Sequence, residues 1–425
     1  DKAEVANVYL GIAVLYADKK EVIPVVQNTS NLEYDLTSAI LKVTSKEVKT
    51  VGFLTGHDEL DIDAQPFEPL RQQLSKQYRV RKVEIKDGKA IDKDIATLVI
   101  AGPKKMLTER EKYEIDQFII RGGRAVFLID PIRIEGGMLQ AMPLATGLND
   151  LLEHYGVKLG NNLVLDVYHD NASFRQGFIT YSLPYPYWIK VLKEYRDRSG
   201  SIGLGFSKES IITSQLESLT LPWASSLELL SQPDKSIEMT ALAKTSQHGW
   251  TVQSPYNLDP NNRVRPPSSV GNAYTVAASL SGVFKSFYAG EAVPPAESSE
   301  SNGSTSPPDR SGQALPAGGE GGGATNENRT TATESQPTQI VVVGNSAFLE
   351  QGRNVMRIVL QRAFRQVLYQ ISSRKLFEAY RSQKREKEGT LRGESTDVGP
   401  WIGIMAFLSL DIVEVGPRDR SSGKL

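Results

Sequence analysis

The chain has 425 residues, enough for two or three domains, and 40% of them are hydrophobic, enough to form a buried core. Its 49 Lys and Arg nearly balance its 50 Asp and Glu, so the chain as a whole is not built to coat nucleic acid or an anionic membrane. The absence of cysteine excludes disulfides, thiol nucleophiles and cysteine-bound metals, and it leaves the cellular compartment open.

The N-terminal part is expected to fold as a hairpin followed by a helix, within residues 1–49. Two β-rich runs flank the turn-like Asp18-Lys19-Lys20, and an amphipathic helix follows residues 31–36 and ends at Val43. The chain begins with Asp1 and has neither a signal-peptide core nor an apolar run of about 18 residues. We therefore expect it to be the soluble part of a longer protein that carries its membrane segments elsewhere.

Residues 50–166 have the pattern of an α/β core. Short apolar strands alternate with helices of about ten to fifteen residues, which is typical of a mostly parallel sheet covered on both faces. One helix has a clear start, because Thr108 is suited to cap it and Glu111 follows three residues later. We predict an open, mostly parallel, Rossmann-like or flavodoxin-like sheet. Its strands are expected at residues 50–54, 78–85, 96–100, 124–129 and 163–166, and its helices at 67–77, 107–121 and 147–155.

Beyond Asp166 the periodicity weakens, and residues 167–289 are interpreted as an inserted lobe. Residues 290–338 consist mainly of Ser, Gly, Pro, Glu and Asn, and they have too little apolar surface to offset the entropy of ordering, so a disordered linker is predicted. Residues 339–352 begin with an apolar run that predicts a strand returning to the core.

The last part, residues 353–425, is predicted to be a basic amphipathic helix and a tail. Between residues 353 and 388, apolar side chains recur every three or four positions, and ten Lys or Arg stand against three Asp or Glu. Two interpretations stay open: the solvated outer face of a packed helix, or a helix that docks on a membrane surface or on a partner.

Candidate functional residues follow the predicted strands. In an open parallel sheet, ligands lie beyond the carboxyl ends of the strands. Here those ends lead into Gly56-His57-Asp58-Glu59, Gly102-Pro103, Asp130-Pro131 and Gly344-Asn345-Ser346. If they converge, His57, Asp58, Glu59 and Asp130 suit metal binding or general acid–base chemistry. The alternatives are a ligand or partner surface, and turn residues favoured for backbone reasons and by helix dipoles.

An aromatic group in the predicted lobe is a second candidate. Tyr185, Tyr187 and Trp188 lie in a Pro-rich stretch read as a loop. They are suited to stack on a sugar or a peptide, and the alternative is local packing of that loop.

Familiar catalytic motifs are missing from the sequence. There is no G-x-x-x-x-G-K-[ST] phosphate loop and no G-x-S-x-G elbow, and the four histidines do not have zinc-site spacing. We therefore predict no catalytic residue, no metal and no cofactor.

The order of several motifs resembles a known family. These are Tyr9-Leu10-Gly11, residues 31–37, residues 52–59, residues 98–103 and Phe127-Leu128-Ile129-Asp130-Pro131. Together they resemble the auxiliary component of bacterial ABC-type transport systems, the gliding-motility-associated GldG-like family. The family pattern has Gly-His-Gly-Glu where this chain has Gly56-His57-Asp58-Glu59, so the chain departs from it at Asp58.

The resemblance implies a membrane-anchored protein on the extracytoplasmic (periplasmic) face of the inner membrane, without enzyme activity. It implies ABC permease and ATPase subunits as partners, with an exported polysaccharide or protein as a second class of partner and no nucleic acid. We expect a non-enzymatic accessory domain whose contact surface includes His57, Asp58, Glu59 and Asp130, with the Tyr185 to Trp188 stretch beside it. The alternatives are a metal-dependent, glycan-acting hydrolase and a purely structural scaffold that docks through the basic helix.

Overall fold

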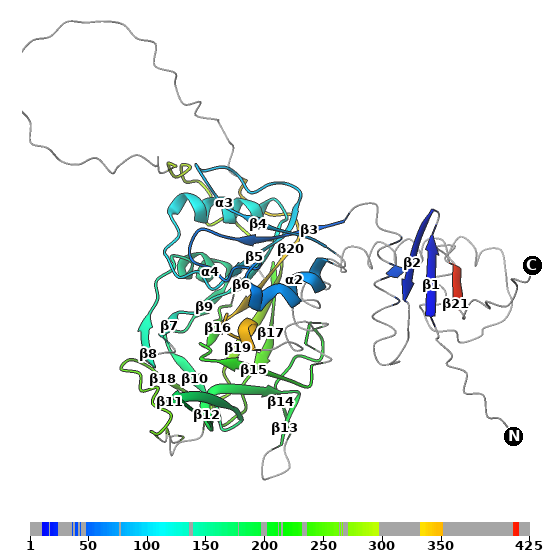
Figure 1. The fold of residues 1–425 in the computed structure, drawn as a ribbon. Coiled ribbons are helices and arrows are strands. Elements are labelled where there is room, and N and C mark those ends of the chain that lie inside the picture. Colours follow the sequence, from blue (N-terminus) through cyan, green and yellow to red (C-terminus); the bar gives the residue numbers. More distant parts are fainter. Residues whose placement is uncertain are drawn as a thin grey trace, which may run out of the picture. The chain divides into compact units, whose positions relative to one another are not determined.

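The structure is a computed structural model, and it describes part of the chain (Figure 1). The described residues are 11–16, 18–23, 36, 39–40, 43, 48–75, 78–135, 139–176, 178–196, 202–210, 212–213, 216–231, 236–262, 264, 266, 271–296, 332–351 and 411–415. Most of the predicted linker and the whole predicted basic helix lie outside them. Among the helices described, none is both long and apolar enough to cross a membrane.

The chain divides into two compact units. The first comprises residues 1–50, 72–80 and 364–425, and the second comprises residues 51–71 and 81–363.

The first unit contains the predicted N-terminal hairpin. Strands β1 (Gly11–Tyr16) and β2 (Lys19–Ile23) pair antiparallel, with Tyr16 opposite Lys19, as predicted. The other edge of β1 pairs antiparallel with β21 (Asp411–Val415), a strand that the sequence analysis did not predict. In the predicted helix that ends at Val43, the described residues are helical, and Ala39 and Val43 are buried against Val14.

The largest sheet has nine strands. Eight follow the order β4-β3-β5-β6-β20-β19-β16-β9, and β17 also pairs with β19. Their bounds are Thr50–Leu54 for β3, Arg79–Val83 for β4, Ile95–Ala101 for β5, Arg124–Leu128 for β6, Val157–Leu159 for β9, Leu227–Leu229 for β16, Ile237–Lys244 for β17, Thr275–Gly282 for β19 and Thr338–Val343 for β20.

The sheet is mixed, which corrects the prediction of a mostly parallel one. Strand β6 pairs in parallel with β5 and with β20, so that Val126 lies opposite Val99 on one side and Val341 on the other. Strand β19, however, is antiparallel to β20, β16 and β17. The described part of the connection from β17 to β19 contains no helix, and without a helical crossover antiparallel pairing is the usual outcome. The parallel, Rossmann-like character is therefore limited to part of the sheet.

Two helices share the main hydrophobic core. Helices α3 (Glu109–Ile120) and α4 (Asn149–Tyr155) lie beside each other in Figure 1, and both contribute to the core cluster that includes β5, β6 and β20. Ile115 and Ile119 of α3 are fully buried there, and burial of such a side chain stabilises the fold by roughly 1.5–3 kcal/mol. The predicted capping box is confirmed, because Thr108 and Glu111 each bond the other's backbone amide. Other short helices in the described ranges are η2 (Gln65–Phe67), α2 (Glu68–Ser75) and α5 (Phe348–Gln351).

The range predicted as an inserted lobe contributes strands to the main sheet and also forms sheets of its own. Strands β16, β17 and β19 belong to the main sheet, whereas β11 (His169–Gln176), β12 (Ile179–Leu192) and β15 (Ser218–Pro222) form a separate three-stranded sheet. Strand β10 (Leu163–Leu165) pairs with β18 (Trp250–Val252) in a sheet of its own, so the strand predicted at residues 163–166 is not part of the main sheet as expected. Two further described pairs are β7 (Ile132–Glu135) with β8 (Gln140–Pro143) and β13 (Glu194–Arg196) with β14 (Ile202–Leu204).

Candidate functional site

The loops that follow β3 and β5 form one hydrogen-bonded surface, which we call the strand-end rim (residues 55–60 and 102–107). The carbonyl of His57 accepts hydrogen bonds from the amides of Lys104 and Lys105, at 2.7 and 3.2 Å. At the end of the first loop, the Leu60 amide donates to the Ala101 carbonyl at 2.9 Å. These bonds give partners to backbone amides and carbonyls that lie beyond the strand pairing, and they hold the two loops against each other.

The turn in the first loop needs residues that tolerate a left-handed backbone. Gly56 has φ 128° and Asp58 has φ 57°. Aspartate is one of the few non-glycine residues enriched in that region, because its short polar side chain bonds locally. Asp58 thus has a backbone conformation that glycine also adopts without strain.

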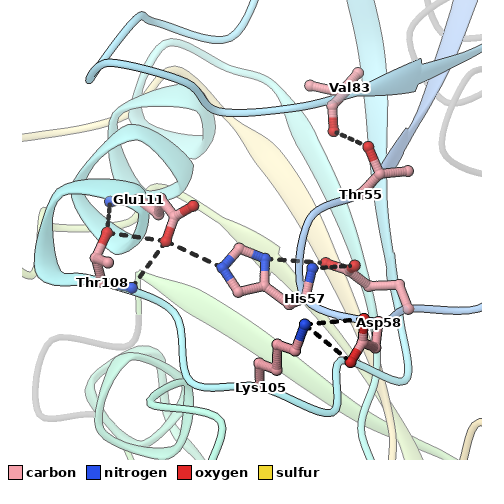
Figure 2. A network of polar contacts seen from close by, with 8 residues as sticks. Thr55, His57, Asp58, Val83, Lys105, Thr108 and Glu111 are labelled. Atoms are coloured by element: carbon pink, nitrogen blue, oxygen red, sulfur yellow. Dashed lines mark hydrogen bonds and ion pairs between the residues drawn. The ribbon is translucent and has the colours of Figure 1, made fainter. Parts of the chain in front are cut away.

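His57 lies between two carboxylates (Figure 2). Its Nδ1 is 3.3 Å from Oε1 of Glu59, and its Nε2 is 3.1 Å from Oε2 of Glu111 on α3. The His57 amide also donates to Glu59, at 2.7 Å. The side chains of His57, Glu59 and Glu111 are only 10%, 2% and 16% exposed, so the three charges are largely shielded from water.

This environment keeps His57 protonated. Hydrogen bonds to Glu111 and Glu59 raise the pKa of His57 to about 9, against the opposing effect of burial. For both glutamates, burial alone would raise the pKa, but hydrogen bonds from His57 and from nearby backbone amides outweigh it and lower the pKa. At neutral pH the group is therefore an imidazolium between two carboxylates, with both ring N–H groups donating.

An imidazolium whose two N–H groups both donate hydrogen bonds cannot act as a general base or as a metal ligand, since both roles need a ring nitrogen with a free lone pair. Its effect here is to join the strand-end rim to the first turn of α3. The sequence analysis assigned Glu111 only to the helix cap and missed this second contact. A histidine in the loop and a glutamate in the helix, 54 residues apart, give no local signal of the link.

The outward surface of the strand-end rim consists of other residues. Asp58 pairs with Lys105 at 3.1 Å, and both side chains are more than half exposed, at 58% and 61%. Lys104 is exposed as well, and Met106 is 62% exposed. An exposed ion pair of this kind contributes little to stability. These four side chains are therefore available for contacts with other molecules.

Asp130 belongs to a neighbouring polar group at the ends of β6 and β20. Its carboxylate accepts the Ser346 amide at 2.7 Å and also the Ser346 hydroxyl. Gly102, at the end of β5, lies directly against them, because a Cβ at this position would be 2.5 Å from Oγ of Ser346. Three of the predicted strand ends thus gather at one edge of the sheet.

The four predicted polar residues do not form a single set of metal ligands. His57 and Glu59 bind each other, Asp58 pairs with Lys105, and Asp130 bonds Ser346. Over the described ranges, no three His, Asp or Glu side chains are grouped as metal ligands would be.

The aromatic candidates lie in a strand, and the expectation of a Pro-rich loop was wrong. Tyr185 and Tyr187 are in β12 and only 2% exposed, and their hydroxyls donate to the carbonyls of Leu258 and Asn257 at 2.9 and 2.8 Å. Burial raises the pKa of both, to about 12 for Tyr187. The β11–β12 register shifts beside the prolines of this stretch, which lets the strand accommodate them.

Trp188 is partly buried in the same strand and meets Trp223 edge-on, with ring centroids 5.7 Å apart. Tyr185, Tyr187 and Trp188 all pack in the core cluster of this lobe. In this structure their rings contribute packing to the lobe.

A comparison with protein families assigns most of the chain to a family. A family model described as "ABC-type uncharacterized transport system" matches residues 48–375, a range that contains the strand-end rim, Asp130 and Ser346. A protein of Borreliella burgdorferi described as uncharacterized is 30% identical over 258 residues, which cover 60% of this chain and 48% of that relative. The chain thus spans about half the length of this curated relative.

Two solved structures show weak similarity. The N-terminal domain of mmIFT52 is 14% identical with a TM-score of 0.38, covering 75% of this chain and 96% of that domain. The exo-β-1,4-mannosidase Op5Man5 from Opitutaceae bacterium strain TAV5 is 15% identical with a TM-score of 0.19, covering 40% of this chain and 31% of the enzyme. Both TM-scores are too low to support a structural or functional conclusion.

Proposed function

We propose that this chain, which belongs to the family of ABC-type transport systems that matches residues 48–375, is a non-enzymatic accessory domain that docks a partner protein of the system on the strand-end rim. The family supplies the transport context. The observation that carries the docking site is the contrast between a fixed interior and an exposed outer surface at the strand-end rim.

The interior of the strand-end rim is preorganised. His57 joins the loop after β3 to α3, and its carbonyl holds the loop after β5. A loop that is fixed before binding loses less conformational entropy when it meets a partner. This favours a permanent contact surface over a flexible connection.

The outer surface has a composition suited to protein recognition. Met106 provides an exposed apolar contact, and Lys104, Lys105 and Asp58 surround it with charge of both signs. In protein interfaces, surrounding charged side chains set the orientation of the partner and the association rate, while a central apolar side chain contributes more of the affinity.

The state of His57 supports a non-enzymatic role for this site. With a pKa of about 9 the imidazole is charged at neutral pH, so it has no lone pair with which to accept a proton from a substrate. The hydrolase alternative requires His57 to act as a base or as a metal ligand, and the two glutamates oppose both.

We further propose the finer features that the sequence resemblance implies. These are a location on the extracytoplasmic (periplasmic) face of the inner membrane, permease and ATPase subunits as partners, and a GldG-like role that includes contact with exported polysaccharide or protein. Their support is the motif order of the N-terminal half and the family match.

Affinity capture of the full-length parent protein in mild detergent tests the proposal. We expect a permease and an ATPase to copurify with the wild-type protein. The Lys104→Glu, Lys105→Glu double variant should lose both subunits. The control variant Ile202→Ser, which alters an exposed apolar residue of the β13–β14 pair outside the strand-end rim, should retain them. Capture of the wild-type protein without any transport component would contradict the proposal.

A further inference from the structure

The β11–β12 hairpin ends in an exposed apolar tip. The register pairs Gln176 with Ile179, so two residues join the strands, and Phe178 is the second of them. Phe178 is fully exposed, at 101%, and Ile179 is 70% exposed. Phe178 and Ile179 are adjacent, so their exposed apolar area lies together at one turn, and it is contiguous apolar area rather than a single exposed side chain that marks an interaction site.

The hairpin is anchored below its tip. The ring of Phe174 packs against Tyr181, with centroids 6.0 Å apart, and edge-on against the buried ring of Tyr185, at 5.1 Å. These contacts connect the hairpin to the core cluster of the lobe. The tip is thus held outward on a packed base. In Figure 1 the strands of this hairpin lie at the end of the second unit opposite α3.

The charge of the hairpin favours an anionic partner. Between residues 171 and 182 the sequence is NASFRQGFITYS, in which Arg175 is the only charged residue. Arg175 is exposed and lies opposite Thr180, close to the tip. At the base of the hairpin, Asp170 and Lys190 form an ion pair at 2.7 Å, so their charges balance. The sequence of residues 171–182 therefore combines the two large apolar side chains with one basic residue and no acidic residue.

From this combination we propose that the β11–β12 hairpin inserts its tip into the interface of an anionic lipid bilayer. A stable protein interface buries about 800 Å² on each partner, far more than two side chains at a turn offer. A bilayer accepts a small protruding group, because Phe and Ile bury their apolar surface among the acyl chains while Arg175 meets the lipid headgroups. The inference is independent of the docking function proposed for the strand-end rim.

The absence of cysteine gives a direct test. The full chain is prepared with Phe178→Cys, or with Met106→Cys as a matched exposed control near α3, and each single thiol is labelled with an environment-sensitive dye. The probe is a phosphatidylcholine vesicle that contains roughly one third phosphatidylglycerol. We expect the emission of the dye at position 178 to shift to the blue on addition of vesicles, and the dye at position 106 to remain unchanged.

Vesicle cosedimentation measures the contribution of the tip to binding. The Phe178→Ser, Ile179→Ser double variant should reduce partitioning of the chain roughly tenfold, and Arg175→Glu should weaken it on anionic vesicles. Unreduced partitioning of the double variant, or an unshifted dye at position 178, would overturn the proposal. A soluble dimer that depends on Phe178 would also overturn it, in favour of a second copy of the chain as the occupant.

Discussion

His57 and Glu111 are 54 residues apart in the sequence, and Nε2 of His57 lies 3.1 Å from Oε2 of Glu111. The same oxygen accepts the Thr108 amide at 2.8 Å and the Thr108 hydroxyl at 2.9 Å. One carboxylate thus both caps α3 and holds the loop after β3. The residue that starts the helix therefore also determines where the loop of the strand-end rim that contains His57 lies.

The Glu111→Gln variant tests the protonation state of His57. The amide can still cap the helix, but it removes the negative charge beside the ring, so the pKa of His57 should fall from about 9 by roughly one unit or more. A proton NMR titration of the four histidines, with the His57 signal assigned by its absence in His57→Gln, measures this value. Asp58→Asn, which alters the same loop away from the ring, should leave the pKa unchanged.

The stability of the protein should depend on the pH through His57. Because its folded pKa of about 9 is above the ordinary value of 6.5, the stabilisation is complete below pH 6.5 and is lost as the pH rises through 9. The expected loss is on the order of 2–3 kcal/mol in the free energy of unfolding.

Urea unfolding at several pH values, compared between the wild-type protein and His57→Gln, isolates this contribution. The two curves should approach each other between pH 6.5 and 9. A difference that stays constant over this range would show that His57 is not charged in the folded protein. Glu59 and Glu111, whose pKa values are lowered, act in the opposite direction, since their contribution is lost as the pH falls through the acid range.

A pair of substitutions at Asp58 tests the left-handed turn. With φ 57° at this position, Asp58→Gly should be close to neutral, whereas Asp58→Ala should destabilise by about 1 kcal/mol. Both variants lose the exposed pair with Lys105, so that contact cancels in the comparison. Thermal unfolding of the two variants gives the answer, and equal midpoints would exclude backbone strain as the reason for the residue type.

A side chain at Gly102 is predicted to destabilise the fold. Its φ is +62°, and a Cβ would lie 2.5 Å from Oγ of Ser346, so Gly102→Ala should destabilise by roughly 1–3 kcal/mol. Ser346→Ala removes the hydroxyl and should reduce the cost of the alanine in the double variant. A double-mutant cycle measured by urea unfolding checks this coupling, and strict additivity would show that the added methyl group does not meet Ser346.

Several elements could be predicted because their signals are local. The strands β3, β5 and β6 are continuous apolar runs, and α3 begins with a capping box that is visible in four residues. Strand β12 was misread as a loop because it contains prolines, and its pairing with two neighbouring strands overrides that signal. The place of β19 in the main sheet was also missed, because residues 167–289 were interpreted as a separate inserted lobe and no local pattern records which strand β19 pairs with.

The candidate site was predictable in position and less so in detail. The rule that strand ends gather at one edge places Gly102, Asp130 and Ser346 together, as observed. The partners of each side chain depend on the packing of α3 against the sheet, which no local pattern records. The exposed residues Lys105 and Met106 were missed for the same reason, since their exposure follows from the burial of their neighbours.

The central claim, that a transport partner docks on the strand-end rim, is tested most directly by site-specific photo-crosslinking in the full-length protein. A photoreactive amino acid is placed at Met106 or, as the matched exposed control, at Ile202. We predict a crosslink to a permease or ATPase subunit from position 106 and none from position 202. A crosslink from position 202 alone would contradict the account, because the partner would then bind a different surface.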